Sequence, residues 1–102
     1  MKVYTQSVNF NADKGLLEFV EKKVGSLVKF HDKIVDAEVF LKLENSSDKE
    51  NKIAEIKINI PGNELVVKKQ FRSFEEAVST GVDTLKRRLK KSKEKLRDSM
   101  PL

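Results

Sequence analysis

Alternation of polar and apolar residues marks four stretches of the chain. Successive side chains of a β-strand point to opposite faces, so a strand that covers a core on one side shows a period of two. The clearest stretch is 52–60, in which one face holds Ala54, Ile56, Ile58 and Ile60. The pattern predicts strands over residues 2–9, 34–44, 52–60 and 64–71.

Two other stretches carry apolar residues at helical spacing. The first covers residues 14–29 and follows Asp13, whose carboxylate can accept hydrogen bonds from the free N–H groups of a first helical turn. The second runs from Ser73 to about Arg97, and at 1.5 Å per residue it would span about 37 Å and project beyond so small a domain. The two apolar stripes consist of Leu16, Val20, Val24 and Leu27, and of Phe74, Val78, Val82, Leu85, Leu89 and Leu96.

The order of these elements predicts an α+β fold of the form β-α-β-β-β-α. A right-handed crossover through the first helix makes the first two strands parallel neighbours, and two hairpin connections add the other two strands antiparallel. The last hairpin turns at Pro61-Gly62, since proline presets φ and glycine tolerates a positive φ. We predict one domain over residues 1–97, built as a four-stranded mixed sheet with both helices on one face, and a short frayed tail at 98–102.

Composition excludes several classes of function. The chain has 102 residues, no cysteine and a single histidine, His31, which leaves no disulfide scaffold, thiol nucleophile or cysteine- or histidine-based metal site. No apolar run approaches the length of a membrane helix, and the alternating N-terminus does not resemble a signal peptide. Catalytic motifs are also missing. We therefore predict a cytoplasmic, non-enzymatic protein without cofactor, metal, small-molecule substrate or membrane partner, with His31 at the end of the first helix or in contact with RNA.

The net charge of +5 is concentrated in the second predicted helix. Residues 84–97 hold eight basic residues and one acidic residue, Glu94. A run of nearly one sign favours an anionic partner over a role in solubility, which mixed charges usually serve. With Leu85 at the centre of the buried stripe, one flank carries Lys86, Lys90, Lys93 and Arg97, and the other carries Arg88, Lys91 and Lys95.

Aligned cations of this kind suit a phosphate backbone. Because the chain has no tryptophan and no pair of aromatic residues on one predicted strand, recognition of structured RNA by shape and phosphate is favoured over stacking of single strands. A helix that lies on a membrane surface is disfavoured, since the apolar side is needed for the core. Lys23 lies between Leu16 and Phe19 in the apolar arc of the first helix, either as a snorkelling side chain or as an ammonium at the groove between the helices.

Several segments together resemble the ribosome hibernation factors, that is, the hibernation promoting factor and ribosome-associated inhibitor family. The resemblance covers residues 1–97 and lies in the order, spacing and length of the segments. It rests on Asn9-Phe10, the cap at Asp13, and the segments EFVEKKVGSLVKFHDKI, IVDAEVFLKLE, IPGNEL and VDTLKRRLKKSKEKL.

The resemblance implies a fold that shares its helix-on-sheet arrangement with double-stranded RNA-binding domains. It also implies a protein that binds the small ribosomal subunit and its rRNA in the channel for mRNA and tRNA, and so inhibits translation in slow growth or stationary phase. It leaves open whether the protein also assists whole ribosomes to form inactive dimers. The implied RNA-binding residues are Lys23, Lys29, Arg87, Lys91, Lys93 and Lys95, to which Lys86, Arg88 and Lys90 add charge.

The chain departs from the pattern of this family in three places. Ser73-Phe74-Glu75 stands where many relatives carry Asp-Met-Tyr, so no RNA contact from that tyrosine is expected. Asp13-Lys14 replaces the usual Thr-Pro start of the first helix. The end at Leu102 resembles the short form, which we expect to be monomeric when free and to need a separate partner to dimerise ribosomes.

Two further functions stay open at this point. One is a regulator that binds a protein, of the sigma-factor modulation type. The other is a general binder of structured RNA.

Overall fold

The structure is a computed structural model that describes residues 1–44 and 49–98, with side chains described up to residue 91 of the last helix. A short 3₁₀ helix, η1, follows the first α-helix. The elements are β1 (Lys2–Val8), α1 (Lys14–Gly25), η1 (Ser26–Lys29), β2 (Asp36–Leu43), β3 (Lys52–Ile60), β4 (Asn63–Phe71) and α2 (Phe74–Asp98). The predicted β-α-β-β-β-α order is confirmed.

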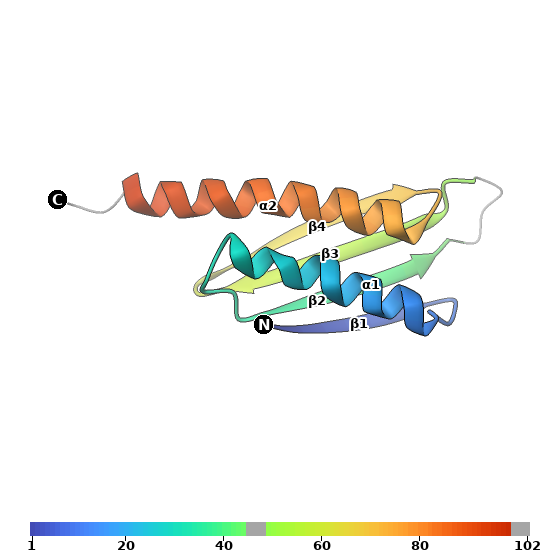
Figure 1. The fold of residues 1–102 in the computed structure, drawn as a ribbon. Helices are drawn as coiled ribbons and strands as arrows, with labels where there is room; N and C mark the ends of the chain where they lie inside the picture. The colour runs from blue at the N-terminus through green and yellow to red at the C-terminus, as the bar shows by residue number, and fades with distance from the viewer. Residues whose placement is uncertain (45–48, 99–102) are drawn as a thin grey trace.

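The four strands form one mixed sheet in the order β1-β2-β3-β4. The pair β1 and β2 is parallel, and the pairs β2 with β3 and β3 with β4 are antiparallel. Both helices lie on one face of this sheet, and the last turns of α2 extend past its end (Figure 1). The predicted topology and the predicted overhang of the second helix are both correct.

The core lies between the sheet and the two helices. Strand β3 contributes Ala54, Ile56 and Ile58, each no more than 1% exposed, as its alternation predicted. Helix α2 contributes the predicted stripe as far as the described side chains reach, and Leu85 and Leu89 are fully buried. None of the helices that the structure describes lies on the opposite face of the sheet (Figure 1), and we call it the open face.

Both predicted helix caps are present. The Asp13 carboxylate accepts a hydrogen bond from the Leu16 N–H at 2.7 Å, and the Ser73 hydroxyl accepts one from the Glu76 N–H at 3.2 Å. Each bond satisfies a donor that a first helical turn leaves free.

An aromatic stack links the starts of the two helices. The rings of Phe10, before α1, and Phe74, the first residue of α2, lie 4.6 Å apart between centroids and are nearly parallel. Phe74 is one of the residues by which the chain departs from the pattern of its relatives, so here its ring has a packing role.

Some predicted boundaries are wrong by a few residues. The first α-helix ends at Gly25 and continues as η1, and there the Ser26 hydroxyl donates to the Lys23 carbonyl at 2.6 Å. Strand β1 ends one residue early because Asn9 adopts a φ of 67°, outside the extended region. The second strand begins at Asp36 instead of residue 34, and the last begins at Asn63. Of the predicted tail at 98–102, residues 99–102 lie outside the described residues.

Gly81 allows α2 to approach the sheet closely. A Cβ atom on this residue would lie 3.0 Å from Ile56 Cδ1 and 3.4 Å from Val67 Cγ1. Such contacts leave no room for a larger side chain in a close-packed interior. The lack of a side chain at Gly81 therefore allows α2 to pack closely against β3 and β4.

We expect Gly81→Val to lower the free energy of unfolding by about 1–3 kcal/mol, because the added atoms must displace core side chains. The matched control is Gly25→Ala, where no atom lies within 4 Å of the added Cβ and the change should stabilise by about 0.5–1 kcal/mol. Urea unfolding followed by circular dichroism measures both. An unchanged midpoint for Gly81→Val would contradict the close approach.

Candidate nucleic-acid interface

Five basic side chains lie on the described part of α2, three between the leucines that anchor it and two directly after them. Leu85 and Leu89 point into the core, so the basic residues next to them are turned outward or onto the flanks. Lys86 is half-buried, and the other four are exposed. We call this set the basic surface: Lys86, Arg87, Arg88, Lys90 and Lys91.

Lys93 and Lys95 were also predicted to bind RNA. Both lie within α2, but their side chains fall outside the described residues, as do those of Leu96 and Arg97. Their role stays a prediction that rests on the sequence.

The ring of Phe30 holds two cations of the basic surface. Lys86 Nζ lies 4.7 Å and Lys90 Nζ 5.1 Å from the ring centroid, within the range of a cation–π interaction. Phe30 directly follows η1 and packs against the core, so its ring has a defined position beside α2. The electron-rich ring face offsets the repulsion between two ammonium groups one turn apart and gives both a defined place.

Arg88 is turned to the opposite flank of α2. Its Nη1 donates a hydrogen bond of 2.7 Å to the carbonyl oxygen of Val66 on the edge strand β4. The remaining donors of its guanidinium group stay on an exposed side chain. Arg88 therefore fastens α2 to the sheet, in addition to the RNA contact that the resemblance implies for it.

Further cations lie on α1. Lys23 is exposed, and its Nζ lies 6.0 Å from the centroid of Phe19. Phe19, Lys23, Ser26 and Phe30 follow one another at roughly i, i+4, i+7 and i+11, which places them along one side of α1 and η1. Phe30, after η1, contacts α2 through Lys86 and Lys90, whereas the aromatic contact of Lys23 is with Phe19 on its own helix, so the position of Lys23 at the groove between the helices stays a prediction. A pocket of about 340 Å³ opens beside Lys23 on the first helical segment, and its lining residues are Phe19, Lys22, Lys23 and Ser26.

The two candidates at the end of the first helical segment differ. Lys29 is exposed on η1 and free to reach a partner. His31 is only 6% exposed, and its Nδ1 accepts a hydrogen bond from the Lys33 N–H at 3.2 Å. His31 was predicted either to end the first helical segment or to contact RNA. Its burial and its local hydrogen bond favour the first of these roles.

The open face carries balanced charge, unlike the basic surface. Lys57 on β3 lies 3.1 Å from a carboxylate oxygen of Glu64 and 3.6 Å from one of Glu38. A hydrogen bond and the charge of Glu64, with the charge of Glu38, raise the pKa of Lys57 above its ordinary value of 10.5. Residues 84–91 contain no acidic residue at all. Among the described side chains, positive charge is therefore concentrated on the basic surface and not on the open face.

Other kinds of site find little support. Within residues 1–44 and 49–98, no three histidine or carboxylate side chains are grouped so as to hold a metal ion. The same part of the chain has no helix long and apolar enough to span a membrane.

Sequence reasoning missed two features, both of which depend on how the elements pair. The contact of Phe30 with two lysines joins segments more than 50 residues apart. Tyr4 and Phe40 each lie on a different strand, and the parallel register of β1 and β2 brings them to neighbouring places on the open face. Alternation within each strand separates its two sides, but it does not indicate that these two rings lie near each other.

Comparisons with known proteins point in one direction. Residues 3–97 match the model of a family described as sigma 54 modulation protein / S30EA ribosomal protein. The chain is 30% identical over 95 residues to a ribosome hibernation promoting factor of Pseudomonas putida, a match that covers 93% of this chain and 89% of that protein. It is 29% identical over 90 residues to a ribosome hibernation promotion factor of Bacillus subtilis, covering 86% of this chain but only 46% of the longer relative.

A solved structure agrees on the fold. A ribosomal subunit interface protein from Coxiella burnetii superposes with a TM-score of 0.80 at 19% identity, over 92% of this chain and 99% of that one.

The contact between Phe30 and Lys90 can be measured with a double-mutant cycle. We expect Phe30→Leu and Lys90→Gln to be coupled by about 0.5–1 kcal/mol in the free energy of unfolding, because both single changes remove the same cation–π interaction. The control cycle pairs Phe30→Leu with Lys91→Gln, whose side chain is exposed on the other flank, and should be additive. Equal coupling in the two cycles would show that the ring does not hold Lys90.

Proposed function

Since the chain belongs to the sigma 54 modulation protein / S30EA ribosomal protein family, we propose that it is a ribosome hibernation factor, which binds the small ribosomal subunit and inhibits translation in slow growth or stationary phase. The proposed site is the channel for mRNA and tRNA, and the mechanism is steric occlusion. The protein would act in the cytoplasm as a monomer, without catalysing a reaction. Assistance in forming inactive ribosome dimers is part of the proposal only where a further partner supplies it.

The observation that carries this proposal is the basic surface on α2. Residues 84–91 contribute five positive charges and no negative ones, on a helix whose other side is committed to the core. Phosphate groups of folded rRNA would displace counterions as these cations neutralise them. Phe30 holds Lys86 and Lys90 in place beforehand, so less side-chain freedom is lost on binding.

Lys23 and Lys29 are proposed to extend the contact onto α1 and η1. Both side chains are exposed, and Lys23 is proposed to reach the groove between the helices. An RNA strand that follows the groove would meet cations from both helical segments. Lys93 and Lys95 are proposed to continue the contact along α2.

Charge reversal of the basic surface should abolish binding to the ribosome. We expect the variant with Lys86, Arg87, Lys90 and Lys91 all changed to Glu to bind small subunits at least about 100-fold more weakly at physiological salt, because its cations become repulsive to phosphate. Co-sedimentation with purified small subunits measures the affinity, and circular dichroism checks the fold.

The matched control reverses four exposed lysines away from the helices: Lys2, Lys42, Lys49 and Lys68. It has the same net charge as the test variant and should still co-sediment. If both variants bound equally well, the basic surface would not be the binding site. Binding of free RNA hairpins as tightly as subunits would indicate a general RNA binder, and salt-insensitive binding to a protein alone would indicate a regulator of the sigma-factor type.

Salt dependence gives an independent measure of phosphate contact. The single change Lys91→Gln should reduce the slope of log affinity against log salt concentration by about 0.9, the expected loss for one phosphate contact. Lys68→Gln on the open face should leave the slope as it is. A slope that Lys91→Gln does not alter would remove Lys91 from the interface.

A further inference from the structure

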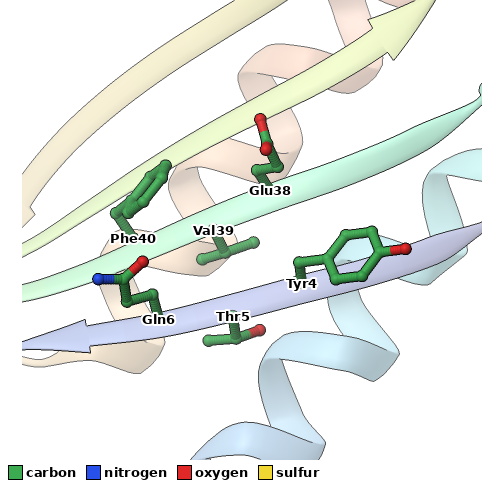
Figure 2. Close-up of a pocket in the computed structure, with 6 residues that line it drawn as sticks. All are labelled: Tyr4, Thr5, Gln6, Glu38, Val39 and Phe40. Carbon is green, nitrogen blue, oxygen red and sulfur yellow. The ribbon is translucent and has the colours of Figure 1, made fainter.

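The open face has a small hollow with an aromatic ring on two neighbouring strands. Tyr4 on β1 is 54% exposed and Phe40 on β2 is 36% exposed. In the parallel register Tyr4 is paired with Glu38, and Phe40 with Gln6, so the two rings stand on a diagonal. The hollow measures about 170 Å³, and its lining consists of Tyr4, Thr5, Gln6, Glu38, Val39 and Phe40 (Figure 2).

The polar groups around this hollow are acceptors for a cation. Glu38 is paired with Tyr4 on β1 and precedes Phe40 by two residues on β2. Glu55 on β3 is paired with Phe40. Figure 2 shows that Glu38 and Phe40 both lean toward β3. The lining contains two aromatic rings, one carboxylate and the Gln6 amide, but no basic side chain.

The same face already stabilises one cation. Lys57 lies between Glu38 and Glu64 at 3.6 and 3.1 Å, and these carboxylates raise its pKa. The open face as a whole carries balanced charge, but the lining of the hollow contains a carboxylate and no basic residue, so this spot favours a cation more than the basic surface does. A phosphate backbone placed here would meet Glu38 and Glu55 at close range.

We propose that the hollow between Tyr4 and Phe40 is a binding site for an arginine side chain from an extended, basic segment of a partner protein. A planar guanidinium group can stack on an aromatic ring and donate to a carboxylate at the same time, which a compact lysine ammonium does less well. Glu38 and the Gln6 carbonyl would accept its hydrogen bonds. This inference concerns the face opposite the proposed RNA-binding surface and does not depend on it.

A titration followed by NMR tests the proposal on the full chain. The probes are blocked peptides of sequence GRGRG and GKGKG, added to the ¹⁵N-labelled protein. We expect saturable shifts of the amides of Tyr4, Gln6, Glu38 and Phe40 with the arginine peptide. The dissociation constant should be at least threefold higher for the lysine peptide.

Two substitutions and their matched controls identify the groups involved. Glu38→Gln and Phe40→Thr should each raise the dissociation constant of the arginine peptide at least fivefold. Glu21→Gln removes the same charge from an exposed position on α1, and Val66→Thr removes an exposed apolar side chain elsewhere on the open face; neither should change it. Amide dispersion reports whether each variant is folded, and Tyr4→Thr replaces Phe40→Thr if the latter is not.

Several results would overturn the proposal. Shifts confined to other parts of the molecule, or equal losses with Glu38→Gln and Glu21→Gln, would mean that the peptide is attracted only by general charge. If a decauridylate RNA shifted the same amides and lost affinity in Phe40→Thr, the hollow would be a stacking site for bases. Shifts of these amides with protein concentration alone would assign the face to a second copy of the chain.

Discussion

Burial of the apolar stripe of α2 against β3 and β4 determines the orientation of the whole helix. Each fully buried leucine contributes about 1.5–3 kcal/mol, whereas an exposed cation–π contact or ion pair contributes about 0.5–1 kcal/mol. The rotation of α2 about its axis is therefore decided by Leu85, Leu89 and the close approach at Gly81. The cations occupy the remaining directions: Lys86 and Lys90 toward Phe30, Arg88 toward β4, and Arg87 outward. The electrostatic character of the helical side is a consequence of core packing.

Much of this fold could be predicted because its strands and helices have regular periods. Alternation in β3 and the stripe of α2 each depend only on local spacing, and Asp13 and Ser73 act on the turn that follows them. The η1 segment could not be predicted in the same way, since residues 26–29 continue the helical pattern and only the local hydrogen bonding differs. The helical spacing of the basic residues predicted on which flank of the helix each side chain lies. Their partners could not be predicted, because Phe30 and Val66 reach α2 only through the tertiary arrangement.

The two faces of the molecule depend on one sheet and yet differ in charge. One face of each strand supplies the core that supports the helices and, with them, the basic surface. The alternate residues of the same strands form the open face, where Lys57 pairs with both Glu38 and Glu64. A change in the strands can therefore alter one face while leaving the other in place, because successive side chains do not share a side.

The hydrogen bond from Arg88 to Val66 has a consequence for the behaviour of the protein in concentrated solution. An edge strand presents unpaired backbone groups that can recruit a strand from another molecule and so begin aggregation. On β4 a carbonyl oxygen is occupied by a guanidinium group, whose charge also repels a second copy brought up in the same orientation. Arg88 of the basic surface therefore protects the edge strand β4 from pairing with a strand of another molecule.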